Sequence, residues 1–189
     1  MQGMDGEDGG AVAKNGVTEA NINLDIAIKL QKLLEQTGIT VILTRSTDES
    51  IYDISSSSSI RKKKVSDLKN RVKIGNESSA DLFVSIHMNK IPQEQYFGWQ
   101  TFYRSNDEKS KKIAELIQKN LNETIQKENT REAKSIKDIY IMENIEIPIT
   151  IVECGFLSNN QELQELQDNV YQEKLAWGIY NGIMEWIFQ

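Results

Sequence analysis

One histidine and two glutamates occupy positions in the sequence that suit a hydrolytic site. His87 is the single histidine among 189 residues, and it follows the largely apolar run of residues 82–86. Glu153 ends a second apolar run, residues 149–152, and Glu19 opens a segment with helical periodicity. A carboxylate that ends a buried strand is costly unless it is paired, bound to a metal or used for proton transfer. These three residues are therefore the first candidates for chemistry.

An imidazole and two carboxylates that face one another suit a zinc hydrolase. Zinc binds His and Glu side chains, keeps a position open for water and lowers the pKa of that water toward about 7. A carboxylate outside the coordination sphere can accept the proton of the water and pass it to a leaving amine. Taken alone, these residues are also compatible with purely structural roles. His87 could be a hydrogen-bonded histidine, and Glu153 could be the structural partner of another group.

Cys154 offers a second kind of chemistry, because it directly follows Glu153. A Cys–His pair can supply a nucleophile and its base. We rank this possibility below the metal site, since the one histidine is already a candidate ligand. A single cysteine also excludes an internal disulfide and a cysteine-rich zinc module.

The elements that must position these residues alternate between strand-like and helix-like patterns. Apolar residues recur at helical spacing between a predicted N-cap at Thr18 and a stop signal at Gly38, and four later segments show the same period. The predicted strands are residues 39–44, 81–87, 97–103, 139–142 and 149–153, and the other predicted helices are residues 60–76, 107–126, 161–167 and 170–188.

This alternation predicts one α/β domain with a twisted, mixed or mostly parallel sheet and helices on both faces. Residues 81–87 are expected to form a central strand that is covered on both faces. In such sheets, functional residues gather beyond the carboxyl ends of the strands. The fold would therefore bring His87 and Glu153 together at the carboxyl ends of their strands, with Glu19 beside them.

Composition narrows the class of protein further. Hydrophobic residues make up 39% and charged residues 26% of the chain, which is ordinary for a globular domain. The net charge of −6 argues against nucleic acid as the main partner. The sequence contains neither an apolar run of membrane-spanning length nor a signal-peptide pattern.

Four segments resemble the zinc-dependent N-acetylmuramoyl-L-alanine amidases (amidase type 3) in order and spacing. They are residues 18–24 (TEANINL), 43–48 (LTRSTD), 80–89 (ADLFVSIHMN) and 152–159 (VECGFLSN). The resemblance covers essentially the whole chain. Residues 59–63 and 67–72, and residues 89–92 after the histidine, are similar to the spore-cortex, germination-specific branch of the family.

The resemblance implies an amidase/phosphorylase-like fold and a role for each candidate residue. Glu19 and His87 would be ligands of one zinc ion. Glu153 would be the catalytic glutamate, which activates water and protonates the departing alanine nitrogen. Asn89 and Arg71 are weaker candidates for orienting the site or contacting substrate. The implied reaction is cleavage of the amide bond between the lactyl group of N-acetylmuramic acid and L-alanine.

The same resemblance implies a biological setting. In the spore-cortex branch, removal of the peptide prepares muramic acid for conversion to muramic-δ-lactam, so a muramic acid deacetylase would act next. Peptidoglycan is then the substrate, in cortex maturation and germination. The expected location is extracytoplasmic, in the forespore or spore envelope. An accessory protein and a homodimer both remain open.

The N-terminus departs from the family pattern, which begins with a strand and a Gly-His-Gly-Gly-like loop whose histidine is another zinc ligand. Residues 6–12 resemble the end of that loop, but the histidine is absent. Depending on the gap, Met4 takes its place or the position precedes Met1. A thioether suits zinc poorly beside carboxylate and imidazole. We therefore expect residues 1–189 to be one N-terminally truncated catalytic domain that lacks its first strand and is inactive or binds zinc weakly.

Two alternative functions remain open at this point. The first is a peptidoglycan-binding or regulatory amidase-like protein that is catalytically impaired. The second is a zinc peptidase that acts on the stem peptide instead of the lactyl amide.

Overall fold

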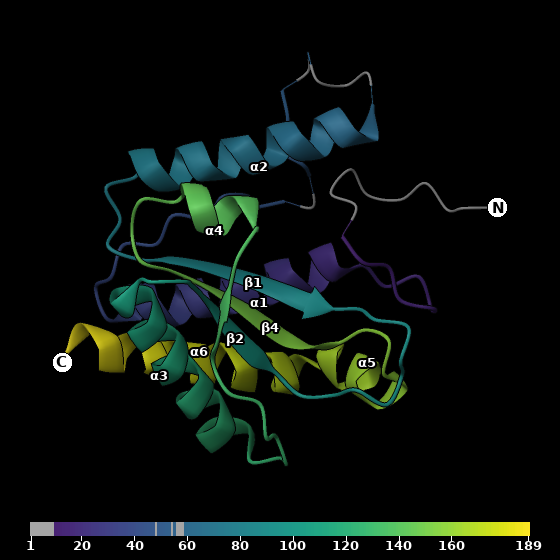
Figure 1. Cartoon of the computed structure of the whole chain (residues 1–189). Helices are drawn as coiled ribbons and strands as arrows, with labels where there is room; N and C mark the ends of the chain where they lie inside the picture. Colours follow the sequence, from purple (N-terminus) through teal and green to yellow (C-terminus); the bar gives the residue numbers. More distant parts are fainter. Residues whose placement is uncertain (1–9, 48, 54, 56–58) are drawn as a thin grey trace.

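The computed structural model describes residues 10–189 with the exception of residues 48, 54 and 56–58 (Figure 1). This part of the chain contains helices and the strands of one sheet, with strict alternation only from β2 to α5. The helices are α1 (Glu19–Gln36), α2 (Ile60–Glu77), α3 (Glu108–Ile125), α4 (Tyr140–Asn144), α5 (Asn160–Leu166) and α6 (Asn169–Ile187). The strands are β1 (Phe83–Asn89), β2 (Gln100–Arg104), β3 (Lys134–Ile136) and β4 (Ile149–Phe156).

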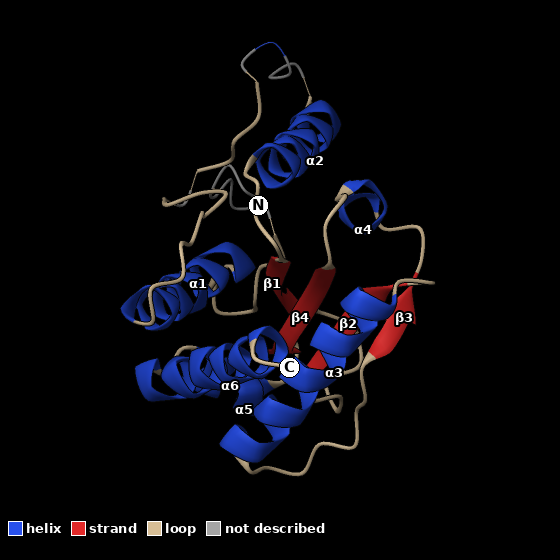
Figure 2. Cartoon of the chain, turned by 90° about the vertical axis from the view of Figure 1, so that its left-hand side faces the viewer, coloured by secondary structure: helices blue, strands red, loops and turns tan. Residues whose placement is uncertain are grey.

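The strands form a mixed sheet in the order β1-β4-β2-β3. β1 runs parallel to β4, β4 runs antiparallel to β2, and β2 runs parallel to β3. Helices α1, α3 and α6 cover one face, and α2 and α4 lie over the other (Figure 2). The predicted α/β class, with helices on both faces of a mixed sheet, is confirmed.

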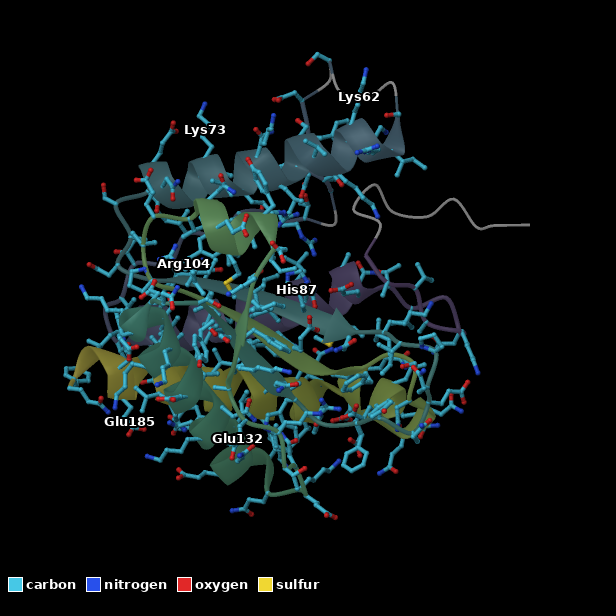
Figure 3. The ribbon with its side chains drawn as sticks, in the orientation of Figure 1. Lys62, Lys73, His87, Arg104, Glu132 and Glu185 are labelled. Carbon is cyan, nitrogen blue, oxygen red and sulfur yellow. The ribbon has the colours of Figure 1, made fainter. Side chains whose placement is uncertain are left out.

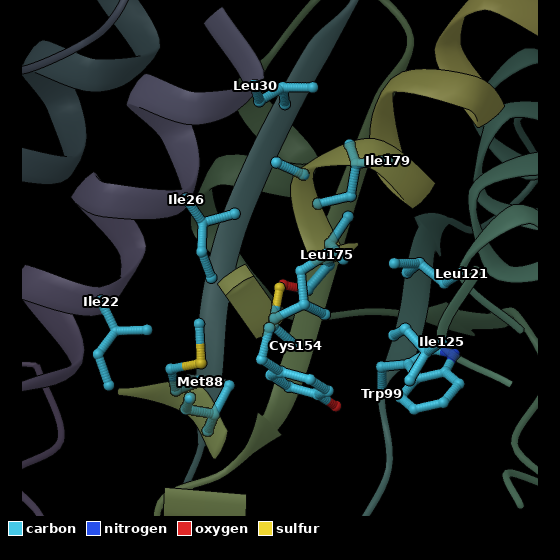
Figure 4. Packing of buried hydrophobic residues seen from close by; sticks show 14 of the residues in the cluster. Ile22, Ile26, Leu30, Met88, Trp99, Leu121, Ile125, Cys154, Leu175 and Ile179 are labelled. Atoms are coloured by element: carbon cyan, nitrogen blue, oxygen red, sulfur yellow. The ribbon is translucent and has the colours of Figure 1, made fainter. Parts of the chain in front are cut away.

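The main core lies between the sheet and the layer of α1, α3 and α6 (Figure 4). Ile26, Leu121, Leu175 and Ile179 are fully buried there against the sheet. Helices α3 and α6 come very close at Gly182, where an added Cβ would lie 2.6 Å from the Cα of Ile117. A smaller core beneath α4 contains Ile141, Met142, Ile145, Ile149 and Ile151.

The first helix begins and ends where the sequence predicts. The Thr18 side chain accepts a hydrogen bond from the Asn21 amide at 3.3 Å and caps α1. Gly38 follows the helix with a φ of 82°, a conformation that glycine adopts without a Cβ penalty. This cap fixes Glu19 in the first turn of α1.

Two strand predictions were wrong. Residues 139–142 lie mostly in helix α4, where Ile141 and Met142 fill the smaller core. A four-residue apolar run has no readable period, so packing decided its conformation. Residues 39–44 form no strand, and none of the described strands pairs with them. β3 was not predicted; its three residues carry little apolar signal.

β1 also differs from expectation, since it is an edge strand of the described sheet and not a central one. It pairs with β4 on one side, and six of its seven residues are only partly buried. Its opposite edge faces residues 39–45 across a cavity. None of the described helices combines the length and apolarity that crossing a bilayer requires.

Candidate active site

The parallel pairing of β1 and β4 brings His87 and Glu153 together. The two residues are register partners near the carboxyl ends of their strands, so their side chains emerge side by side on one face of the sheet. That face is the one covered by α2, and His87 lies in the space between α2 and the sheet (Figure 3). Glu19 reaches the same place from the first turn of α1. The structure therefore unites the three residues that the sequence singled out.

Glu19 is held through both of its carboxylate oxygens. Oε1 lies 2.9 Å from Nδ1 of His87 and accepts a hydrogen bond from the Met88 amide at 3.2 Å. Oε2 accepts a hydrogen bond from the Ala11 amide at 2.9 Å. A Cβ on Gly10 would lie 2.9 Å from Oε2, so the backbone approaches the carboxylate closely there. The loop before α1 thus fixes the position of Glu19.

These contacts determine the charge states of Glu19 and His87. Burial acts to raise the pKa of Glu19, but hydrogen bonds from His87 and from the Ala11 and Met88 amides outweigh it, and the pKa falls to about 2. Burial acts to lower the pKa of His87, but the hydrogen bond and charge of Glu19, together with the charge of Glu153, raise it. Glu19 is therefore ionised at neutral pH.

Glu153 lies in a different environment from Glu19. Its Oε2 atom is buried and has no hydrogen-bond partner among the described residues. Burial raises the pKa of Glu153 to about 7; the charge of Glu19 contributes, and the charge of His87 opposes the change. A carboxylate whose pKa is near neutrality can both accept and return a proton. The two glutamates of the site thus differ in charge state because their surroundings differ.

Ser85 belongs to the site, although the sequence analysis gave it no role. Its Oγ lies 2.9 Å from Nε2 of His87, on the side of the ring opposite Glu19. Residues two apart on a strand share a face, so the spacing of Ser85 and His87 was a signal that could have been read. Both ring nitrogens of His87 therefore have defined neighbours.

Arg71 and Asn89, the two weaker candidates, lie near the site in different ways. Arg71 projects from α2, donates hydrogen bonds to Asp67 at 2.6 Å and to Thr44 at 3.0 Å, and lines the same cavity as His87 and Glu153. Its charge opposes the protonation of His87. Asn89 is the last residue of β1, and its carbonyl accepts a hydrogen bond from the Leu157 amide at 2.8 Å.

Glu162 is a buried carboxylate that sequence reasoning missed. It accepts hydrogen bonds from the Gly98 amide at 2.9 Å and the Phe156 amide at 2.8 Å. These bonds tie the end of β4, just beyond Glu153, to the loop before β2. Phe156 is only six residues away in sequence, but Gly98 is 64 residues away, so no local pattern indicates that Glu162 links the two segments.

Cys154 does not face His87. Its thiol is fully buried in the main core, on the face of β4 opposite that of Glu153, and burial raises the pKa of the thiol. A Cys–His nucleophile is therefore incompatible with this fold.

The donor types at the site fit zinc, but the described residues supply few of them. Glu19 and His87 are ligands of the kind that zinc takes, and the unpartnered oxygen of Glu153 lies beside them. No group of three or more His, Cys, Asp or Glu side chains able to hold a metal occurs in the described ranges. Met4, one of the two alternatives for the position of the family histidine, lies outside the described residues.

The chain is similar in sequence and in structure to several known proteins. The family model described as N-acetylmuramoyl-L-alanine amidase matches residues 1–185. The germination-specific N-acetylmuramoyl-L-alanine amidase of Bacillus subtilis is 37% identical over 97% of this chain and 76% of its own length. The CwlD amidase of Clostridioides difficile, solved in complex with the GerS lipoprotein, has 42% sequence identity and a TM-score of 0.92, over 100% of this chain and 94% of that one. A second amidase, from Clostridium difficile, has 29% identity and a TM-score of 0.83, over 97% and 92% of the two chains.

Proposed function

The chain belongs to the N-acetylmuramoyl-L-alanine amidase family, and we propose that it hydrolyses the amide between the lactyl group of N-acetylmuramic acid and L-alanine in peptidoglycan. The observation that carries this proposal is the meeting of Glu19, His87 and Glu153 at the carboxyl ends of β1 and β4. Two carboxylates with opposite pKa shifts beside an imidazole form a site for proton transfer next to a bound electrophile.

We propose that Glu19 and His87 hold one zinc ion. Glu19 is ionised at neutral pH, and the Met88 and Ala11 amides fix its two oxygens. His87 is oriented by Ser85 on the other side of the ring. When bound, zinc would supply a Lewis acid for the lactyl carbonyl and lower the pKa of water.

Glu153 is proposed as the group that moves the proton. Its unpartnered, buried oxygen is free to accept a proton from the attacking water. Because its pKa is near 7, the same oxygen can then deliver that proton to the alanine nitrogen as the amide breaks. Arg71 above the site and Asn89 at the end of β1 are proposed to contact substrate or to orient the ligands.

The narrower role in the spore cortex is also a proposal. A relative named germination-specific and a solved neighbour that binds a lipoprotein support it. On this view the chain acts outside the cytoplasm, in the forespore or spore envelope. It removes peptides so that a muramic acid deacetylase can act next and muramic-δ-lactam can form. A lipoprotein-type accessory partner or a homodimer would complete the active form.

Mass analysis of digested peptidoglycan tests the reaction. An amidase releases peptides that begin with L-alanine and leaves muramic acid without its peptide. A peptidase would release fragments of the stem peptide and leave L-alanine attached to the lactyl group. A binding protein would bind the glycan and release nothing, with or without added zinc. Either of the last two results would contradict the proposal.

A further inference from the structure

Helix α2 is a basic element on an acidic protein. It carries seven of the 22 lysine and arginine residues of the chain and two of the 28 aspartate and glutamate residues. The net charge of the helix is therefore +5, whereas the whole chain has −6, so the remainder of the chain carries −11. This asymmetry places a positive potential at one part of the surface, where it attracts an anionic partner.

The inner side of α2 is occupied by contacts within the protein. The Asp67 carboxylate accepts a hydrogen bond from the Ile51 amide at 2.9 Å, and the Ser66 hydroxyl accepts one from the Asp53 amide at 3.0 Å. Gly75 lies close against α4, where an added Cβ would be 2.6 Å from an isoleucine side chain. These contacts leave the opposite side of the helix facing solvent.

Three lysines form a row along this outer side, which we call the α2 row. Lys62, Lys69 and Lys73 are all exposed, and their spacings of seven and four residues are close to two turns and one turn of an α-helix. Lys62 and Lys73 project away from the sheet (Figure 3). The row extends about 16 Å along the helix axis. Val65, which is 46% exposed, lies between Lys62 and Lys69 on the same side.

The charges of the α2 row are not used inside the protein. None of its three lysines forms an ion pair with a described residue. By contrast, Lys119 pairs with Glu185 at 3.0 Å, and two other lysines of the described chain also pair with glutamates. Like charges four residues apart on a helix, such as Lys69 and Lys73, repel one another and cost stability. A bound anion would remove that cost.

The α2 row lies close to a source of anions, because α2 lies above the candidate active site. Arg71, on the inner side of this helix, lines the cavity that contains His87 and Glu153. Each hydrolysis in the proposed reaction leaves the lactyl group of muramic acid as a free carboxyl, which is ionised at neutral pH. A glycan strand that has lost its peptides is therefore a linear polymer with carboxylates at regular intervals.

We propose that the α2 row binds glycan strands from which the peptides have been removed, through ion pairs between the lysines and the lactyl carboxylates. Binding there keeps a strand next to the active site after its first peptide has left. The choice of ligand rests on the proposed reaction, whereas the basic surface is a property of the chain itself. A single row of cations on one helix fits a linear polymer. An anionic lipid surface is a poorer partner, because it would repel the acidic remainder of the chain.

Binding of a defined glycan, and not hydrolysis, tests this proposal. The probe is soluble peptide-free glycan that contains muramic acid, and the matched uncharged probe is an N-acetylglucosamine oligomer of the same length, which has no lactyl group. Isothermal titration calorimetry with the full chain gives both affinities. We expect the carboxylated glycan to bind at least about tenfold more tightly than the uncharged oligomer, and its affinity to fall as the salt concentration rises.

Two triple variants with the same change in net charge locate the binding surface. The first changes the whole α2 row: Lys62→Gln, Lys69→Gln and Lys73→Gln. The control changes exposed lysines outside α2: Lys32→Gln, Lys109→Gln and Lys137→Gln. Glutamine is a helix former like lysine, so α2 is retained. We expect the first variant to bind peptide-free glycan about tenfold more weakly than the unmodified chain and the control to bind it as the unmodified chain does.

Two results would overturn the proposal. One is equal affinity of the two triple variants for peptide-free glycan. The other is binding of phosphatidylglycerol vesicles, but not of the glycan, through the α2 row. Failure of the proposed reaction gives a different pattern: a chain that releases no L-alanyl peptide, but binds peptide-free glycan through the α2 row, contradicts the reaction and supports this inference.

Discussion

His87 on β1 and Glu153 on β4 are register partners in two parallel strands, and both lie near the carboxyl ends of those strands. Their side chains share one face, while Cys154 and Met88 point into the core on the other. This relationship gives the site a basic group and an acid with a pKa of about 7 as neighbours, with Glu19 completing the group.

Replacement of Glu153 by Gln should abolish turnover without removing the metal ligands. The amide keeps the shape of the carboxylate but cannot accept the proton, so we expect amide hydrolysis to fall by about 100-fold or more. Zinc affinity should change little. Release of L-alanyl peptides from peptidoglycan measures the first effect, with the exposed Glu128→Gln as a matched control. Full activity in Glu153→Gln would remove Glu153 from the mechanism.

The raised pKa of Glu153 predicts a pH-dependent cost in stability. The folded protein holds this proton up to a pH of about 7, whereas the unfolded chain releases it near pH 4.5. Folding stability therefore falls as pH rises between these values and the cost is constant above pH 7. Relative to Glu153→Gln, the unmodified protein should lose roughly 1–3 kcal/mol between pH 5 and pH 8.

Denaturant unfolding of the two proteins in the presence of a chelator measures this difference. A difference in the free energy of unfolding that does not vary with pH would show that the carboxyl of Glu153 is solvated like an ordinary surface glutamate.

Glu19→Gln should weaken zinc binding. The substitution removes the charge of a carboxylate that is ionised at neutral pH while keeping acceptor and shape, and we expect the zinc dissociation constant to rise at least tenfold. Competition with a chelating dye gives the affinity, again with Glu128→Gln as the control. If Glu19→Gln and the unmodified protein bind zinc with equal affinity, the metal lies elsewhere or the chain holds none.

Ser85 should select the tautomer of His87. With Nδ1 facing Glu19, a proton on Nε2 can be donated to the Ser85 hydroxyl. Ser85→Ala should remove the acceptor of the Nε2–H proton, change the Nε2 resonance of the ring and raise the zinc dissociation constant about tenfold. The chain has one histidine, so ¹⁵N NMR of labelled imidazole reports this ring alone. Ser85→Thr keeps the hydroxyl and should behave as the unmodified protein; identical spectra for Ser85→Ala would contradict the role.

Gly182→Ala should destabilise the fold although alanine favours helices more than glycine does. The new Cβ would lie 2.6 Å from the Cα and 2.8 Å from the amide nitrogen of Ile117, and backbone atoms cannot move aside cheaply. We expect a loss of about 1–3 kcal/mol in the free energy of unfolding. Asn181→Ala on the same turn is the control and should stay within about 0.5 kcal/mol. A stabilised Gly182→Ala protein would mean that α3 and α6 pack less closely.

The sequence by itself determined the fold class and the identity of the chemical groups. Helix α1 could be predicted at both ends because Thr18 and Gly38 act locally, through a cap and a positive φ. His87 and Glu153 could be placed at strand ends because each terminates an apolar run. The carboxyl ends of parallel strands lie at the same edge of the sheet, so the two residues were expected to be close together. The segments that carry the family resemblance include Thr18, His87 and Glu153.

Only the tertiary structure decided which side chains of the site contact one another and which strand forms the edge of the sheet. The opposite pKa shifts of Glu19 and Glu153 arise from burial and from hydrogen bonds to residues distant in sequence. Residues 39–44 carry the composition of a strand and yet form none, because a strand requires a hydrogen-bonded neighbour. A chain encodes the local preference for extended structure, but pairing across space determines whether that preference becomes a strand.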